Sequence, residues 1–213
     1  MSDLPTRILL IRHGLNDYVK EHRLAGRTPG VHLNAEGLAQ AAALAERLAS
    51  IALAAIYSSP LERACETAAP LAERLALTVQ LLDDVKETDC GAWTGQLLDD
   101  LSKGDLWRQV QGCPSIFRFP DGESFVEIQA RMVAALELVR AAHPGQTVAV
   151  FSHADPIKLA AAFYTGMPLD LFQRLEIAPA SISELEFTPC NPRLARLNDC
   201  AHLKPTGPAP VAD

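Results

Sequence analysis

Apolar residues along the chain gather in short runs, and two of these runs predict buried strands. Residues 6–12 (TRILLIR) and 147–152 (TVAVFS) are nearly continuously apolar, as in strands that are covered on both faces. Weaker runs predict four further strands, at residues 54–58, 78–82, 182–187 and 193–197. We take the segment at 78–82 to be an edge strand.

Helical signals occupy the segments between these strands. Phe125, Ile128, Met132, Leu136 and Val139 recur along one face of a predicted helix. Start signals predict three more: Asn34 as the cap of a helix to about residue 48, Ser59-Pro60-Leu61-Glu62 as the capping box of one to about residue 75, and Asp155-Pro156 as the start of another. Strands that alternate with helices predict an α/β fold, a three-layer sandwich with a largely parallel central sheet flanked by helices.

The domain organisation is predicted to be simple. The length of 213 residues suits one domain, and no internal repeat or linker divides the chain. Residues 83–124 combine two tryptophans with several glycines and two prolines, so we expect an irregular insertion that acts as a lid over the site. We assign residues 1–203 to the domain and expect a disordered tail at 204–213.

Basic and histidine side chains follow three of the predicted strands. Arg12 and His13 end the first strand, Arg63 lies just beyond the second, and His153 follows the 147–152 strand. Ligands of open α/β sheets bind outside the carboxyl ends of the strands. The pattern therefore gathers two histidines and two arginines at one edge of the sheet, where an anion can bind.

Phosphate fits these four side chains chemically. Arg63 falls in the first turn of its helix, where a cation is unfavourable unless an anion also binds the helix start. Guanidinium groups bind phosphate through paired hydrogen bonds, and a neutral imidazole is a competent nucleophile toward phosphorus. The alternatives for single residues are an Arg63 on the surface, paired with Glu62 or Glu66, and histidines that are only structural.

Charge and composition exclude several other classes. The net charge of −7 argues against nucleic acid as a partner. The N-terminal apolar run covers only residues 8–11, and no segment approaches the ~20 apolar residues of a membrane span, so we expect a cytoplasmic protein. Five widely spaced cysteines without a Cys-x-x-Cys pair are interpreted as thiols rather than disulfides or metal ligands.

A resemblance to a known family follows from a series of motifs. In order along residues 6–165, the chain resembles the histidine phosphatase (phosphoglycerate-mutase-like) superfamily. The matching blocks are Arg12-His13-Gly14, Leu33-Asn34-Ala35-Glu36-Gly37 with Gln40-Ala41, Ser58-Ser59-Pro60-Leu61-Glu62-Arg63 with Thr67-Ala68, Glu87 with Gly91-Ala92-Trp93-Thr94-Gly95, Pro120-Asp121-Gly122-Glu123-Ser124, and Val150-Phe151-Ser152-His153. Each block alone is a weak signal, but their order is specific.

The resemblance implies a role for each matching residue. His13 would become the phosphohistidine, and Arg12, Arg63 and His153 would hold the phosphoryl oxygens. Glu87 would protonate the leaving oxygen and then activate water; from sequence alone it is one acid among Asp83, Asp84, Glu87 and Asp89.

Two positions depart from the family pattern. Asn16 stands where the family has Thr or Ser, and we expect its amide to keep the hydrogen bond to phosphate. Ala154 follows the second histidine, where Gly is common; a backbone with positive φ there would make Ala unfavourable. Arg23 and Arg27 resemble positions of a bacterial subgroup of phosphomutases or phosphatases, and are candidates either for substrate contact or for solvated loop residues.

The predicted function is that of a metal-independent phosphatase without a cofactor, acting on a small phosphorylated metabolite through a phosphohistidine. A phosphoglycerate mutase is the nearest alternative, although true cofactor-dependent mutases carry a longer insertion between the general acid and the second histidine. A zinc hydrolase lacks support from any His-Glu-x-x-His cluster. A catalytically inactive phosphate-binding module is disfavoured by the presence of all five charged groups. Neither the substrate nor the oligomeric state can be derived from the sequence.

Overall fold

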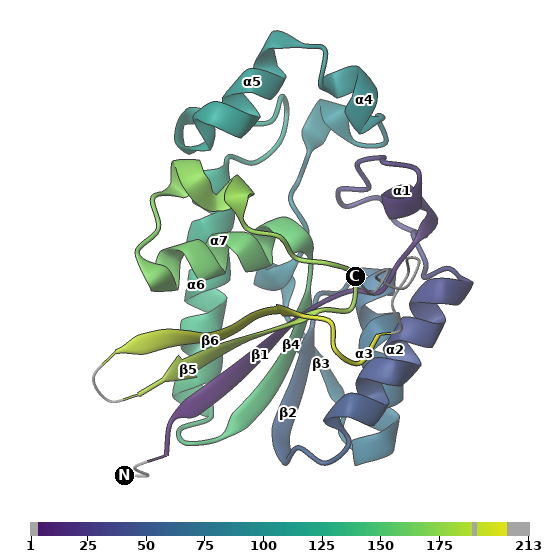
Figure 1. The fold of residues 1–213 in the computed structure, drawn as a ribbon, viewed down its shortest axis with the longest axis vertical. Coiled ribbons are helices and arrows are strands. Elements are labelled where there is room, and N and C mark those ends of the chain that lie inside the picture. The colour runs from purple at the N-terminus through teal and green to yellow at the C-terminus, as the bar shows by residue number, and fades with distance from the viewer. Residues whose placement is uncertain (1–3, 189–190, 204–213) are drawn as a thin grey trace, which may run out of the picture.

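The computed structural model describes residues 4–188 and 191–203 and shows a six-stranded sheet between helices (Figure 1). The strands are β1 (Thr6–Arg12), β2 (Leu53–Ser58), β3 (Val79–Leu81), β4 (Thr147–Ser152), β5 (Ile182–Phe187) and β6 (Pro192–Asp199). The α-helices are α1 (Asp17–Lys20), α2 (Ala35–Leu48), α3 (Glu62–Leu75), α4 (Leu98–Leu101), α5 (Asp105–Gly112), α6 (Phe125–Ala142) and α7 (Ala154–Thr165). Short 3-10 helices are η1 (Asp83–Val85), η2 (Gly91–Trp93), η3 (Pro114–Ile116) and η4 (Leu169–Arg174).

The sheet is mostly parallel, as the sequence predicted. Its order is β3-β2-β4-β1-β5-β6, in which β3, β2, β4 and β1 run parallel to their neighbours. β5 pairs antiparallel with β1, and β6 pairs antiparallel with β5. The two central strands β1 and β4 are buried on both faces, because their alternate residues pack into two different apolar clusters, and this explains their continuous apolar sequences.

Helices cover both faces of the sheet, and alternate residues of β1 separate the two layers (Figure 1). Leu9 and Ile11 pack in one cluster with Leu44 of α2 and with residues of α3. Ile8 and Leu10 pack in the opposite cluster, which includes residues of α6 and α7. Burial of each such side chain contributes roughly 1.5–3 kcal/mol. The predicted three-layer arrangement is confirmed.

The segment from η1 to η3 is more regular than predicted. It contains α4 and α5, which lie at the top of Figure 1, away from the sheet. These helices have only four and eight residues, too few to produce a clear periodic signal. A third cluster underneath them includes Trp93, Phe117, Phe119, Phe125 and Phe172. This aromatic cluster holds the segment against α6, α7 and η4.

Strand positions were predicted within about two residues, whereas two helix starts were wrong. α3 begins at Glu62, not at Ser59-Pro60, and its N-cap Leu61 offers no side-chain hydrogen bond. α7 begins at Ala154 after His153, so Asp155 does not cap it. In both cases the sequence motif stands beside the site described below, where Ser59 and Asp155 make other contacts.

Cys65, Cys90, Cys113 and Cys200 are free thiols. The predicted tail at 204–213 lies outside the described residues. No helix in the described part of the chain is both long and apolar enough to cross a bilayer.

Candidate active site

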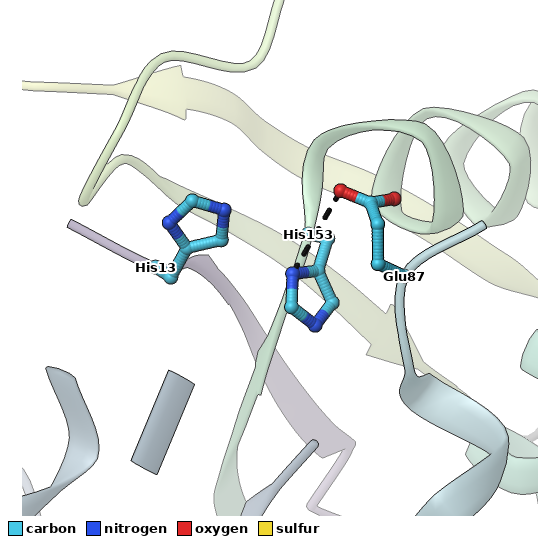
Figure 2. A group of neighbouring side chains, drawn as sticks. All are labelled: His13, Glu87 and His153. Atoms are coloured by element: carbon cyan, nitrogen blue, oxygen red, sulfur yellow. Dashed lines mark ion pairs between the residues drawn. The ribbon is translucent and has the colours of Figure 1, made fainter. Parts of the chain in front are cut away.

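The carboxyl ends of three neighbouring parallel strands bring the candidate residues together. His13 follows β1, His153 follows β4 and Ser59 follows β2, the strand on the other side of β4. The backbone ladder continues past the strand ends, because His13 N donates to Ser152 O at 3.0 Å and Ser59 N donates to Phe151 O at 2.9 Å. Figure 2 shows the His13 and His153 rings side by side with Glu87 next to His153.

His13 is held as a neutral imidazole with a free Nε2. Its side chain is buried, and Nδ1 lies 2.7 Å from the carbonyl oxygen of Gly14. A carbonyl oxygen only accepts, so Nδ1 carries the ring hydrogen and Nε2 keeps its lone pair. Burial lowers the pKa of His13 well below its ordinary value, and the charges of Arg63 and Arg12 lower it further. Neutral Nε2 is the form that can attack phosphorus.

The loop after His13 rests directly on α2 and α3. Gly14 N donates to Thr67 Oγ1 at 2.9 Å, and Leu15 N donates to Gln40 Oε1 at 2.8 Å. A Cβ on Gly37 would lie 2.0 Å from the carbonyl oxygen of Leu15, so only glycine permits this approach. All three residues that make these contacts, Gly37, Gln40 and Thr67, lie in the family-like motifs, although the sequence alone predicts no individual role for them.

His153 is oriented by a serine from the adjacent strand end. Its Nε2 lies 2.8 Å from Ser59 Oγ, which also accepts a hydrogen bond from Leu61 N at 3.3 Å. With the Ser59 hydroxyl hydrogen directed to Nε2, the ring hydrogen of His153 resides on Nδ1. Burial and then Arg63 lower the pKa of His153 well below its ordinary value. A bound dianion would oppose this effect, because it favours the protonated imidazole.

Three residues of the pocket lining, Arg12, Asn16 and Arg63, carry four buried nitrogen atoms that have no hydrogen-bond partner among the described residues. Arg63 is fully buried, and its Nη2 donates to Gly26 O at 2.8 Å while Nε and Nη1 have no partner. Arg12 Nη1 donates to Ile177 O at 2.6 Å while Nε has no partner. Asn16 caps α1 with its oxygen, and its Nδ2 is the fourth such atom. Each unpaired buried donor costs about 1–3 kcal/mol, so the site is built to receive an anion.

Glu87 lies on the other side of His153. Its Oε1 accepts a hydrogen bond from Thr88 N at 2.9 Å, and its Oε2 lies 3.8 Å from His153 Nδ1, as drawn in Figure 2. Only 18% of the side chain is exposed. Burial raises the pKa of Glu87, and the nearby carboxylate of Asp155 raises it further. A carboxyl group with a raised pKa can be both donor and acceptor of a proton near neutral pH.

A network of two arginines and a glutamate fixes the backbone around Glu87. Arg131 of α6 donates to the carbonyl oxygens of Asp84, Lys86 and Glu87 at 2.7–3.1 Å. Both carboxylate oxygens of Glu123 accept from the same guanidinium. The sequence does not predict this network, and its only signal there is the Pro-Asp-Gly-Glu-Ser motif that carries Glu123.

Arg27 belongs to this network and is not among the residues that line the pocket. Its Nε donates to Glu87 O at 3.0 Å, and its Nη2 lies 2.9 Å from Glu123 Oε2. The second candidate, Arg23, does line the pocket, although its Nη1 donates to Gly95 O at 2.7 Å. Ala154 also lines the pocket as the first residue of α7, where its right-handed helical backbone tolerates an alanine.

The pocket has a volume of about 760 Å³ and contains one cluster with metal-ligand chemistry. Within the described residues, one ligand atom from each of His13, Glu87 and His153 lies within 4.8 Å of the others. Arg12 and Arg63 face the same space, and their positive charges oppose a divalent cation there. The charge distribution favours an anion over a metal ion.

Comparison with known proteins identifies related chains. Residues 8–200 match the family model described as Histidine phosphatase superfamily (branch 1). The chain is 32% identical to Phosphoserine phosphatase 1 of Hydrogenobacter thermophilus over 92% of this chain and 94% of that protein. It is also similar to the solved structure of a mycobacterial glucosyl-3-phosphoglycerate phosphatase in complex with VO3, with a TM-score of 0.79 and 28% identity over 90% of this chain and 98% of that one.

Other relatives are longer than this chain. Bifunctional protein Rv2228c of Mycobacterium tuberculosis is 38% identical over 86% of this chain but only 50% of its own length. The chain therefore spans about half the length of the first curated relatives it matches.

Proposed function

The chain belongs to the histidine phosphatase superfamily, and on that basis we propose that it is a metal-independent phosphatase that hydrolyses a small phosphorylated metabolite. The observation that carries the proposal is the convergence of a neutral His13 Nε2 with the unpaired donors of Arg12, Asn16 and Arg63. One nucleophile and a set of N–H donors around a common space are the requirements for phosphoryl transfer.

The first step forms a phosphohistidine. Nε2 of His13 attacks phosphorus, a P–N bond forms, and the P–O bond to the leaving group breaks. Protonated Glu87 gives its proton to the leaving oxygen, so the product departs as an alcohol. The Gly14 carbonyl keeps its hydrogen bond from Nδ1–H and stabilises the positive charge on the phosphorylated ring. Arg12, Arg63, Asn16 and His153 hold the phosphoryl oxygens.

The second step returns the enzyme to its starting state. Glu87, now a carboxylate, accepts a proton from a water molecule that attacks phosphorus. The P–N bond breaks, inorganic phosphate leaves, and His13 is again neutral. No proton need move to or from Nδ1 of His13. The raised pKa of Glu87 suits both half-reactions, because the carboxyl group must be protonated in one and ionised in the other.

The relatives support the substrate class only in outline. Two similar proteins are named as phosphatases of phosphoserine and of glucosyl-3-phosphoglycerate, both small phosphorylated molecules. The segment at 83–124 supplies Trp93, Trp107 and Phe119 to the pocket, in keeping with a lid over the site. Action in the cytoplasm remains a prediction from the sequence.

A phosphate-release assay over a panel of phosphorylated metabolites, with EDTA present, tests the proposal. We expect release that EDTA does not reduce, together with an acid-labile phosphoryl group on His13 when the reaction is quenched. Interconversion of 2- and 3-phosphoglycerate that exceeds phosphate release would assign a mutase instead. Activity that EDTA abolishes and zinc restores would assign a metal hydrolase to the His13, Glu87 and His153 cluster.

A further inference from the structure

A mostly buried lysine lies on the pocket wall beyond the phosphate-binding groups. Lys158 of α7 lines the same pocket as Arg12 and Arg63, and only 16% of its side chain is exposed. It follows His153 by five residues, about 7.5 Å along the axis at 1.5 Å per residue. Because helical side chains lean toward the N-terminus of their helix, the Lys158 ammonium group is directed back toward the strand ends.

The contacts of Lys158 fix the position of its ammonium group but do not use all of its hydrogen-bonding capacity. Nζ lies 3.6 Å from Asp155 Oδ1 and donates to Gln173 Oε1 at 3.3 Å. Strong charge-assisted hydrogen bonds are shorter, about 2.7–2.9 Å, and an ammonium group has three hydrogens to donate. Lys158 is therefore held on the wall by Asp155 and Gln173 and can still bind an anionic group.

The other cations on this part of the wall are less suited to a ligand. Arg23 is 36% exposed, donates to Gly95 O at 2.7 Å and lies 3.6 Å from Glu21 Oε2. Arg174, at the end of η4, is exposed to solvent. The charge of Lys158 is better shielded from water than either, and electrostatic attraction is stronger where solvent is excluded.

We propose that Lys158 binds a carboxylate on the leaving group of the substrate. The assignment rests on the proposed phosphatase function and names its substrate class, small phosphomonoesters that carry a carboxylate close to the ester oxygen. A carboxylate matches the single charge of one ammonium group. A second phosphate would bring two negative charges against the adjacent Asp155 with only one lysine to balance them.

Two matched pairs of substrates test this assignment. Phosphoserine and phosphoethanolamine differ by the carboxylate, as 3-phosphoglycerate and glycerol 3-phosphate differ by a carboxylate in place of a hydroxymethyl group. Phosphate release is measured for the unchanged protein, for Lys158→Met and for Lys158→Arg, with p-nitrophenyl phosphate as an ester without a carboxylate. Lys103→Met is the matched control, because Lys103 is 74% exposed and outside the pocket lining.

We expect the unchanged protein to prefer the carboxylated member of each pair in kcat/KM. Lys158→Met should reduce that preference by about 10-fold to 100-fold, mainly through KM, since a hydrogen bond to a charged group is lost. Lys158→Arg and Lys103→Met should retain it. Taking the ratio within a pair removes any general effect of the substitution on folding or on Glu87.

Two results would overturn the assignment: Lys158→Met keeps the full preference for the carboxylated ester, or the unchanged protein shows no such preference. In either case, hydrolysis of p-nitrophenyl phosphate would still support the proposed phosphatase. Failure of the unchanged protein to release phosphate from every ester, p-nitrophenyl phosphate included, would instead refute the proposed function and the assignment with it.

Discussion

The imidazole rings of His13 and His153 lie with their centroids 5.1 Å apart, and strand register explains this spacing. Arg12 pairs with Ser152 at the last position of the parallel ladder between β1 and β4, and the two histidines are the next residues on each strand. Neighbouring strands lie about 4.8 Å apart, close to the separation of the rings. The sheet itself therefore places the proposed nucleophile, His13, beside His153, the residue proposed to bind the transferred phosphoryl group.

Replacement of His13 tests the nucleophile. His13→Ala should reduce phosphatase kcat at least about 10³-fold, because no other group supplies the attacking lone pair. The acid-labile phosphoryl label on the protein should disappear with it. His143→Ala is the matched control, since His143 bonds to Tyr57 Oη at 2.9 Å and lies outside the pocket lining. Substantial turnover by His13→Ala would remove His13 from the mechanism.

Replacement of Glu87 tests the proton donor. Glu87→Gln keeps the shape of the side chain but cannot transfer a proton, so kcat for alkyl phosphates should fall by roughly 10²–10⁴-fold. The loss should be smaller for p-nitrophenyl phosphate in the first step, because its leaving group needs little protonation. Rapid-quench measurement of the phosphoenzyme separates the two steps. Equal losses of the phosphorylation rate for both kinds of ester would argue against Glu87 as the acid.

The pH dependence of kcat/KM follows from two opposite pKa shifts. His13 acts when neutral, and its lowered pKa places the ascending limb below pH 6.5. Glu87 acts first when protonated, and its raised pKa places the descending limb above the ordinary value of a glutamate. Asp155 raises the Glu87 pKa, so Asp155→Asn should move the descending limb to lower pH and leave the ascending limb in place.

The measurement uses glycerol 3-phosphate, an alkyl ester whose leaving oxygen needs a proton. It carries no carboxylate, so effects on the proposed carboxylate contact of Lys158 are avoided. Asp99→Asn, on the exposed surface of α4, is the control and should leave both limbs in place. A descending limb that does not move in Asp155→Asn would show that Glu87 does not govern it.

The sequence predicted the strands and the strand-end residues better than the contacts between them. An apolar run such as TRILLIR directly indicates a strand that is buried on both faces. His13 follows this run, and the parallel pairing of β1 with β4 is enough to place it beside His153. Ser59 misled the prediction because the same residue type caps helices and binds imidazoles. In the structure its hydroxyl group lies 2.8 Å from His153 Nε2, and α3 begins at Glu62, two residues after the predicted first helical residue Pro60.

The network around Glu87 could not be predicted, because it depends on long-range geometry. Arg131 is an ordinary residue of an amphipathic helix in the sequence, and only the docking of α6 places it against three carbonyl groups. Arg27 likewise stands in a basic loop that suggests substrate contact, yet the fold directs it to Glu123. Loop conformation decides such contacts, and it leaves little periodic signal.

Arg131 is expected to act as a positioning residue for Glu87. Arg131→Lys retains the charge but loses the planar fork that reaches several oxygens at once. We expect kcat to fall about 10-fold with little change in KM, and the descending pH limb to shift. In a Glu87→Gln background the same substitution should cost no further activity. Arg140→Lys, on the same helix but 44% exposed, should change neither parameter.

A purely structural role for Arg131 predicts a different result. The melting temperature would fall, while kcat of the folded fraction and its pH profile would match those of the unchanged protein. An additive loss of activity in the double variant would likewise contradict the positioning role, because it would show that Arg131 acts independently of Glu87.

Gly37 should control the position of His13 through the contact between α2 and the loop that follows β1. In Gly37→Ala the new Cβ would lie 2.0 Å from Leu15 O, so the backbone of one segment must move. We expect a loss of about 1–3 kcal/mol in the free energy of unfolding and a fall in kcat of up to about 10²-fold, since small displacements of a nucleophile are costly. Gly112→Ala is the control: its Cβ meets nothing within 4 Å at the end of α5, and stability should be unchanged or slightly higher. Urea denaturation and steady-state kinetics measure both effects. Should Gly37→Ala match the unchanged protein in both, the loop after His13 would be free to adjust, and its close approach to α2 would have no part in holding the nucleophile.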